Sequence, residues 1–165
     1  EKIVSDTTTF WFKKKKYDWT FYLDVFNNEI VGYDVRDSMN GNGILNHYEA
    51  LNDMLNNKIK RGYKDLITIV HTDQGSVYSS VSFNNIFNSY KVTRSMSRAG
   101  TPTDNPVNES LNGWIKEELF IDFDLKHSND VPNLIKLYID YYNNERPSYA
   151  LKYKTPIQYK IESGF

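Results

Sequence analysis

The sequence contains no cysteine among its 165 residues, and it has only 5 prolines and 8 glycines. Without cysteine, neither a disulfide framework nor a thiolate metal site is possible. No apolar run approaches the roughly 20 residues that a membrane-spanning helix needs, and no signal-peptide pattern opens the chain. These absences predict a cytoplasmic globular protein without a membrane-bound part.

The composition is that of one well-buried domain. Hydrophobic residues make up 39% of the chain and aromatic residues 15%, which is enough for a sizeable core. The net charge is −1, so the chain as a whole is not a general binder of polyanions. Basic residues nevertheless gather locally, at Lys13–Lys16 and around Lys58–Lys64. Local basic patches can bind phosphate even when acidic residues elsewhere cancel the sum.

The first part of the chain predicts three antiparallel strands. Lys2–Phe12 is rich in β-branched and aromatic residues, and Lys13–Lys16 forms the turn after it. Apolar and polar residues then alternate over Tyr17–Phe26, which is typical of a half-buried strand. A tight turn at Asn27-Asn28 leads into a third strand, Glu29–Val35.

The rest of the chain predicts alternating helices and strands. Helical spacing of apolar residues or helix-capping signals occur in four segments: Asn42–Asn57, Val81–Asn88, Asp104–Phe120 and Val131–Asn143. Short strands are predicted at Leu66–Val70 and Lys91–Thr93, with a loop over Ser95–Thr103. The fold class predicted for residues 1–165 is therefore α/β, a mixed sheet flanked by helices in a single domain.

Three carboxylates stand out by their positions. Asp73 comes just after the predicted strand Leu66–Val70, where α/β sheets commonly place functional groups. Asp6 lies inside the first strand, on the face shared by Val4 and Thr8. Glu109 lies on the helix that starts near Asp104. The predicted core stripe of that helix consists of Val107, Leu111, Trp114, Ile115 and Leu119.

Each carboxylate taken singly has an ordinary structural interpretation. Asp73 can be a turn former that hydrogen-bonds its own backbone, Glu109 a solvated surface residue, and Asp6 a strand-edge residue. Three carboxylates that converge repel one another, and divalent cations relieve that repulsion. Oxygen ligands suit Mg²⁺ or Mn²⁺, and such a cluster is the usual basis of a two-metal reaction on phosphodiesters.

Other chemistries fit the sequence poorly. His71 and Ser76 lie near Asp73, but the Gly-x-Ser-x-Gly elbow of a hydrolytic triad is missing. The three histidines lack the spacing of a zinc site, and there is no glycine-rich or Walker-type loop for a nucleotide.

Several motifs together resemble one family. The segment His71-Thr72-Asp73-Gln74-Gly75-Ser76-Val77-Tyr78 is similar to the second-aspartate motif of insertion-sequence transposases with an integrase-like core. The segment from Ser95 through Asn105, running on to Asn108-Glu109-Ser110, resembles the signature around that family's catalytic Glu. Asp73 and Glu109 are separated by 109 − 73 − 1 = 35 residues, the spacing of the DDE class. Val4-Ser5-Asp6-Thr7-Thr8, Leu23–Phe26, Ile30–Tyr33, Tyr142–Pro147 and Leu151–Pro156 resemble further parts of the same family.

This resemblance covers nearly the whole chain and implies an RNase H-like fold. It implies that Asp6, Asp73 and Glu109 are catalytic and bind two Mg²⁺ or Mn²⁺ ions. The implied reaction is nicking of DNA at the ends of a mobile element, followed by strand transfer of the freed 3′-hydroxyl to target DNA. The family's N-terminal DNA-binding region is missing, so we expect a fragment of a longer transposase. Thr72 and Ser148 depart from the residues that the family more often has there.

The resemblance also implies partners and further contacts. Lys116 lies seven residues after Glu109 on one edge of the helix and is expected to contact DNA phosphate near the site. Arg98 and Asn105 are expected either to hold the Ser95–Asp104 loop or to touch DNA. A homo-oligomer assembled on DNA is expected, because two DNA ends must be held together. The expected location is the bacterial cytoplasm, at the nucleoid when the protein acts on DNA.

Four alternatives stay open at this point. The domain could be a simple RNase H-like nuclease that never joins ends, or a domesticated, non-catalytic domain that binds DNA or a partner. Asp24 is the second choice for the first carboxylate, on a strand face shared with Thr20 and Tyr22. The run Lys13–Lys16 is expected to be a solvated hairpin tip rather than a DNA clamp.

Overall fold

A computed structural model describes residues 1–39, 42–72, 80–87, 90–96 and 106–165; the side chains of residues 42, 43, 82 and 106–112 lie outside this description. The described strands are β1 (Lys2–Phe12), β2 (Lys15–Asp24), β3 (Glu29–Asp37), β4 (Thr68–Thr72) and β5 (Val92–Met96). The described helices are α1 (Asn42–Lys60), α2 (Val81–Phe87), α3 (Pro106–Ile121), α4 (Val131–Asn144) and α5 (Pro156–Glu162), with short 3-10 turns η3 (Leu125–His127) and η4 (Tyr149–Leu151). In this described part of the chain, no helix is both long and apolar enough to cross a membrane.

The five strands form one mixed sheet in the order β3-β2-β1-β4-β5. The β1–β2 and β2–β3 pairs are antiparallel, as the alternating patterns predict. The β1–β4 and β4–β5 pairs are parallel. β1 therefore lies at the centre of the sheet and joins an antiparallel half to a parallel half, which confirms the predicted mixed α/β sheet.

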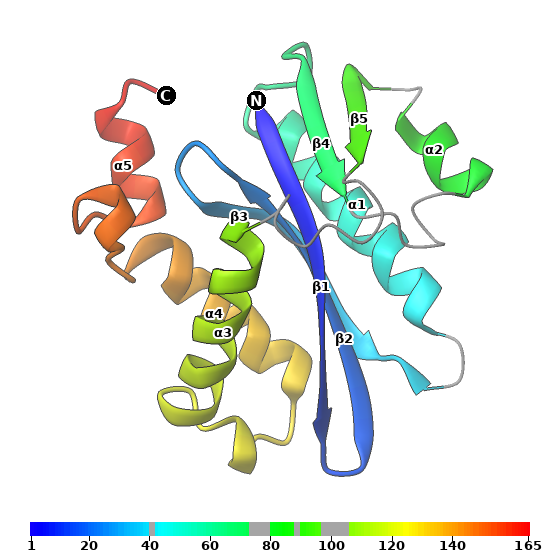
Figure 1. Cartoon of the computed structure of the whole chain (residues 1–165), viewed down its shortest axis with the longest axis vertical. Helices are drawn as coiled ribbons and strands as arrows, with labels where there is room; N and C mark the ends of the chain where they lie inside the picture. The colour runs from blue at the N-terminus through cyan, green and yellow to red at the C-terminus, as the bar shows by residue number, and fades with distance from the viewer. Residues whose placement is uncertain (40–41, 73–79, 88–89, 97–105) are drawn as a thin grey trace.

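Helices cover both faces of this sheet. In Figure 1, α3, α4 and α5 lie to the left of the long β1–β2 hairpin, and α1 and α2 lie to its right. Val4, Phe21 and Leu23 from the strands pack with residues of α3 and α4 in a first core cluster. Ile3 and Tyr22 pack with residues of α1 and α2 in a second cluster. Since neighbouring strand residues point to opposite faces, the two clusters mark the two faces of the sheet.

The hairpin between β1 and β2 is tighter than predicted. Only Lys13 and Lys14 form its tip, with positive φ angles of 45° and 64°, and Lys15 already pairs with Phe12. Two-residue turns with positive φ match the twist of the flanking strands, so pairing continues to the tip. Lys13, Lys14 and Lys15 are exposed, as predicted for a solvated tip, and Lys13 Nζ also donates hydrogen bonds to Ser128 O and Asn129 Oδ1.

The fourth strand lies two residues later than predicted. Lys58 of α1 is fully buried, and its ammonium donates to Tyr63 O and Leu66 O at 2.5 and 2.6 Å. These bonds hold the chain in a turn through residue 66, so β4 begins only at Thr68. β5 continues to Met96 because it stays paired with β4 as far as Thr72, which takes two residues from the predicted loop.

α5 was not predicted from the sequence. It starts with a capping box, in which Gln158 N donates to Thr155 Oγ1 and Thr155 N donates to Gln158 Oε1, both at 3.1 Å. The Thr-Pro pair at its start is the local signal that would have indicated it. Its seven residues are too few for the helical periodicity to be recognised.

The edge strand β3 is covered by side chains rather than left open. Asn143 of α4 donates to Ile30 O at 3.0 Å and accepts from Ile30 N at 2.9 Å. Asp53 Oδ2 of α1 accepts from Tyr33 N at 3.0 Å. Such partners satisfy backbone groups that would otherwise be open to pairing with another chain. α1 can approach this edge closely because Gly32 has no side chain there.

Candidate active site

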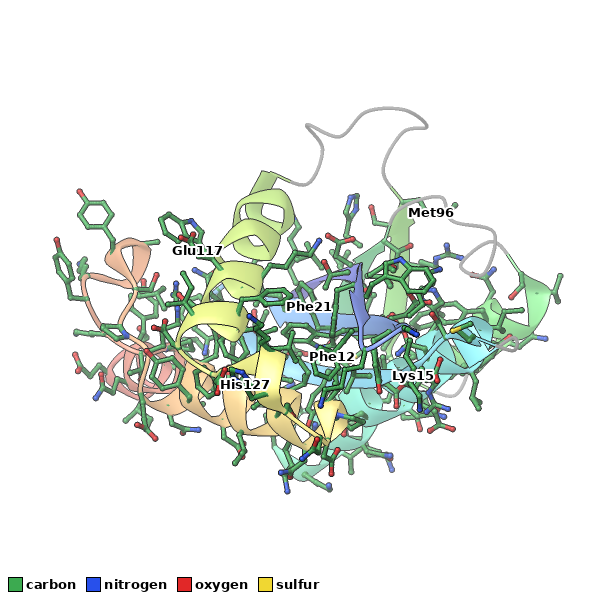
Figure 2. The ribbon with its side chains drawn as sticks, turned by 90° about the horizontal axis from the view of Figure 1, so that it is seen from below. Phe12, Lys15, Phe21, Met96, Glu117 and His127 are labelled. Carbon is green, nitrogen blue, oxygen red and sulfur yellow. The ribbon has the colours of Figure 1, made fainter. Side chains whose placement is uncertain are left out.

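Asp6 lies in the middle of β1, on the sheet face that α3 and α4 cover. Its antiparallel partner is Phe21, which lies inside the molecule in Figure 2 and belongs to the first core cluster. Val4, two residues earlier, belongs to the same cluster, so strand alternation places Asp6 on this face, as predicted. The side chain is half-buried, and Oδ1 accepts a hydrogen bond from Thr7 N at 2.8 Å. A carboxylate is costly in this setting unless a charged group meets it.

β4, the parallel neighbour of β1, ends one residue before Asp73, the second predicted carboxylate. The register of β1 and β4 pairs Val4 with His71, and β4 ends at Thr72. Counted along the sequence, Asp6 and Asp73 each stand two residues beyond that pair. Asp73 lies outside the described residues, so its place beside Asp6 stays a prediction.

α3 carries the third predicted carboxylate and packs over the same face as Asp6. Ile115 and Leu119 are buried in the first core cluster, and the helix contacts β1. Figure 1 shows β1 passing between the first turn of α3 and the carboxyl end of β4. Glu109 lies in the first half of this helix, but its side chain is outside the described part of the structure. Lys116 is exposed to solvent, which fits the predicted phosphate contact without testing it.

The predicted core stripe of α3 is wrong at Trp114. This side chain is 58% exposed, whereas the neighbouring Ile115 is fully buried. Ile115 and Leu119 form the row that contacts the sheet, and each helical step turns by about 100°. Trp114 therefore lies away from the contact. Val107 and Leu111 are outside the described side chains, as are Arg98 and Asn105.

Three residues to which the sequence assigned no role hold α3 against α4. Glu118 of α3 accepts hydrogen bonds from Tyr138 of α4 and from Arg146, which follows α4. We call Glu118, Tyr138 and Arg146 the Glu118 cluster. Arg146 belongs to the closing motif Tyr142–Pro147, so the motif itself was the available signal. The motif does not indicate that Arg146 pairs with Glu118, which lies 28 residues earlier in the chain.

Asp24, the second choice for the first carboxylate, lies on the opposite face of the sheet from Asp6. Its neighbour Tyr22 belongs to the second core cluster, and strand alternation puts Asp24 on that face with it. Asp24 is only 6% exposed, and its Oδ1 accepts a hydrogen bond from Phe26 N at 3.0 Å. Burial raises the pKa of this carboxyl group above its usual value. The surroundings are those of a buried turn residue.

Within the described ranges, no group of three or more His, Cys, Asp or Glu side chains could hold a metal ion. The side chains of Asp73 and Glu109 are outside those ranges. His71, next to the predicted site in sequence, has Nδ1 3.1 Å from Ser95 Oγ of β5.

Comparison with known proteins agrees with this architecture. The integrase core domain family matches residues 1–102, and a second integrase core domain family matches residues 90–156. InsK, assigned as a transposase of insertion sequence element IS150 from Escherichia coli K12, is 32% identical over 163 residues, covering 99% of this chain and 55% of InsK. The transposase of IS904 from Lactococcus lactis is 32% identical over 135 residues, covering 81% of this chain and 51% of that protein. The chain thus spans about half the length of these relatives.

Solved structures share the fold at lower identity. The catalytic core domain of the integrase of human T-cell lymphotropic virus HTLV-2, in complex with magnesium, superposes with a TM-score of 0.69 at 21% identity, covering 95% of this chain and 93% of that one. A chain of the simian T-cell lymphotropic virus intasome gives a TM-score of 0.76 at 20% identity, covering 95% of this chain and 52% of that one. These likenesses confirm the predicted RNase H-like fold. Since the family match covers more than half of the residues, the chain belongs to the integrase core domain family, alongside transposases of bacterial insertion sequences.

Proposed function

We propose that this chain is the catalytic core of an insertion-sequence transposase, with Asp6, Asp73 and Glu109 as its catalytic carboxylates. The observation that carries the proposal is the place of Asp6. It lies on a central strand that contacts both α3 and β4, the two elements that bear or precede the other carboxylates. Two elements from distant parts of the sequence thus converge on the strand of the first aspartate.

The donor set fits hard divalent cations. The proposed ligands are carboxylates from Asp6, Asp73 and Glu109, and the chain has no cysteine to favour a softer metal. We assign two Mg²⁺ or Mn²⁺ ions to this set, supported by the magnesium in the structure of HTLV-2 integrase. When bound, such ions activate the attacking oxygen and stabilise the leaving oxygen of a phosphodiester.

The reaction proceeds in two displacements at phosphorus. In the first, water attacks a phosphodiester at the element end, and the bond to the 3′-oxygen breaks to leave a free 3′-hydroxyl. In the second, that 3′-hydroxyl attacks a target phosphodiester, forming one new bond while one target bond breaks. The number of phosphodiester bonds is conserved in this second step, so no nucleotide triphosphate is needed.

The chain's own residues align these reactants. Asp6 pairs with Phe21 of β2, and Val4 two residues earlier also pairs with His71 of β4, which helps to hold the backbone of Asp6 in place as DNA enters. Lys116, exposed on α3, contacts a DNA phosphate beside the site, and Arg98 and Asn105 contact DNA from the segment before α3. We assign element ends and target DNA as substrates, with a homo-oligomer assembled on them.

The proposal is tested by measuring Mn²⁺ binding calorimetrically and strand cleavage on labelled, branched DNA. The proteins compared are the wild type, Asp6→Asn, Asp73→Asn and Asp24→Asn. Asp24 serves as the matched control, because it is an aspartate of a neighbouring strand on the other face. We expect Asp6→Asn and Asp73→Asn to lose both metal binding and cleavage, and Asp24→Asn to keep both.

Other outcomes point to different functions. Metal-dependent cleavage without joined products indicates a simple nuclease. DNA binding without metal binding in the wild type indicates a non-catalytic domain and ends the catalytic proposal. Equal metal binding by the wild type and Asp6→Asn removes Asp6 from the ligand set.

A further inference from the structure

The side chain of Glu118 connects α3, through hydrogen bonds, to the segment that includes α4 and the closing motif. Arg146 Nε donates to both carboxylate oxygens of Glu118 at 2.8 Å, and Arg146 Nη2 lies 2.6 Å from Oε1. Tyr138 donates its hydroxyl to Oε2, also at 2.8 Å. A forked guanidinium–carboxylate contact fixes orientation as well as distance.

The Glu118 cluster is well enclosed. The side chains of Glu118 and Arg146 are only 17% and 20% exposed, and Tyr138 is fully buried. Burial, followed by the hydrogen bond to Glu118, raises the pKa of Tyr138, so its hydroxyl stays protonated and donates. The Tyr138 ring packs edge-on against Trp19 of β2, and the Arg146 guanidinium lies over the Tyr142 ring. The cluster therefore connects α3 to the rigid core rather than to another surface side chain.

Two sets of contacts act on α3 from different directions. Ile115 and Leu119 hold it against the sheet, while Glu118 holds the flank that faces α4. Apolar contacts alone allow a helix to roll on a sheet, because they are not directional. The directional bonds of Glu118 limit that rotation.

The rotation of α3 about its axis decides which way position 109 of the helix faces. Glu118 comes nine positions after Glu109, and nine steps of about 100° amount to two full turns and a half turn more. The two positions therefore lie on opposite flanks of the helix. α4 contacts β3, at one edge of the sheet, while α3 contacts the central β1. The flank opposite Glu118 therefore faces towards β4, the strand that ends one residue before Asp73.

We propose that the Glu118 cluster is a positioning device, which sets the rotation of α3 and thereby directs Glu109 towards the metal site. Glu118, Tyr138 and Arg146 are positioning residues that touch neither metal nor DNA. This inference rests on the proposed function for its catalytic consequence, but its structural part does not. It also assigns a role to the arginine of the closing motif.

A matched ion pair elsewhere in the molecule serves as the control. Arg36 donates to Asp34 from Nε and Nη2 at 2.7 and 2.8 Å, and these side chains are 25% and 18% exposed. The pair resembles Glu118–Arg146 in geometry and burial. It lies within β3, and Arg36→Gln does not alter any contact of α3.

The first measurement needs neither metal nor DNA. Spin labels are attached at Phe120→Cys on α3 and Thr93→Cys on β5, both exposed positions. Because the chain has no cysteine of its own, the labels attach only there. Pulsed EPR gives the distance distribution between them in the wild-type background and with Arg146→Gln, Tyr138→Phe or Arg36→Gln. We expect a shifted or broader distribution with Arg146→Gln, a smaller change with Tyr138→Phe, and none with Arg36→Gln.

The second measurement is the Mn²⁺ concentration that gives half-maximal cleavage of branched DNA. We expect Arg146→Gln to raise it about tenfold, the size of effect typical of residues that orient metal ligands. DNA affinity stays unchanged, and Arg36→Gln behaves like the wild type even where both variants melt at lower temperature. If Arg146→Gln does not fold, Arg146→Lys and Tyr138→Phe give the same test.

The two measurements separate the possible failures. An unchanged distance distribution in both Arg146→Gln and Tyr138→Phe overturns the positioning role, as does an equal change with Arg36→Gln. A changed distribution with unchanged Mn²⁺ dependence overturns the link to Glu109. A wild type without metal-dependent cleavage contradicts the proposed function, while the EPR distances still decide whether the cluster holds α3.

Discussion

Asp6 of β1 and Asp24 of β2 lie on opposite faces of the same sheet, and their surroundings differ. Asp6 is half-buried on the sheet face that α3 covers, and its strand pairs with the one that leads to Asp73. Asp24 is almost fully buried on the α1 face and bonds to the backbone of its own turn. Residue type and strand position alone therefore do not assign a role to an aspartate. What matters is which elements from elsewhere in the chain meet that face.

On the α1 face, buried polar side chains hydrogen-bond to other groups of the protein. Asn46 of α1 donates to Asp18 O and Asp34 O at 3.1 and 2.8 Å, and Thr20 donates to Asn46 Oδ1. These bonds satisfy buried groups of both partners. On the α3 face, the core cluster lies beside the half-buried Asp6. One face thus serves stability, and the other combines stability with the proposed site.

The largest expected effect is on the α3 face. Asp6→Asn removes a negative charge from the metal site without changing the size of the side chain. We expect cleavage of branched DNA to fall by at least about 100-fold, beyond the loss typical of residues that only orient ligands. The melting temperature should stay close to that of the wild type. Cleavage within a factor of about two of the wild type would contradict the role of Asp6.

The next effect concerns the α1 face. A Cβ at position 32 would lie 2.4 Å from Met54 Cα, so Gly32→Ala forces α1 away from β3. We expect the free energy of unfolding to fall by about 1–3 kcal/mol, measured by urea denaturation. The Mn²⁺ dependence of cleavage should stay unchanged below the melting transition. A shift in that dependence would mean that the two faces are coupled.

Removing the polar contacts of α1 should have a smaller effect. Asn46→Ala leaves the hydroxyl of Thr20 without this acceptor, and it removes two donated bonds to backbone carbonyls and one to Asp34 Oδ2. We expect a loss of about 1 kcal/mol in the free energy of unfolding, because Thr20 Oγ1 keeps its hydrogen bond with Thr7 Oγ1. Gly113→Ala on α3, where an added Cβ meets open space, is the control and should lose none.

The smallest effect is expected for Asp24→Asn. Burial raises the pKa of Asp24, so the folded state binds this proton more strongly than the unfolded state does. The contribution of this group to stability is then fully present below its unfolded pKa of about 3.9 and is lost as pH rises through the folded pKa. Asparagine stays neutral and keeps the acceptor for Phe26 N. We expect a melting temperature higher by about 1–3 °C at pH 7, with the gain shrinking towards pH 4. A lower melting temperature at pH 7 would show that the ionised carboxylate is stabilising.

Local patterns predicted the elements well where a strand or helix has a clear period. β1 and α1 begin at the predicted residues, and the face shared by Val4, Asp6 and Thr8 is confirmed. β4 was displaced because Lys58, on another element, holds the preceding turn with its buried ammonium. Trp114 was assigned to the core because helical spacing alone does not distinguish the sheet-facing row from its neighbour.

The sequence by itself determined the succession of strands and helices from β1 to α4, the face of Asp6 and the motifs of the integrase core domain family. These follow from short-range geometry and from residue identity, which the chain carries before it folds. Only the tertiary structure decided that Asp24 lies across the sheet from Asp6 and that Glu118 pairs with Arg146. The physical reason is that such contacts join residues far apart in the chain. Their geometry depends on how whole elements pack, because the side chains of one helix meet those of another only after both have docked on the sheet.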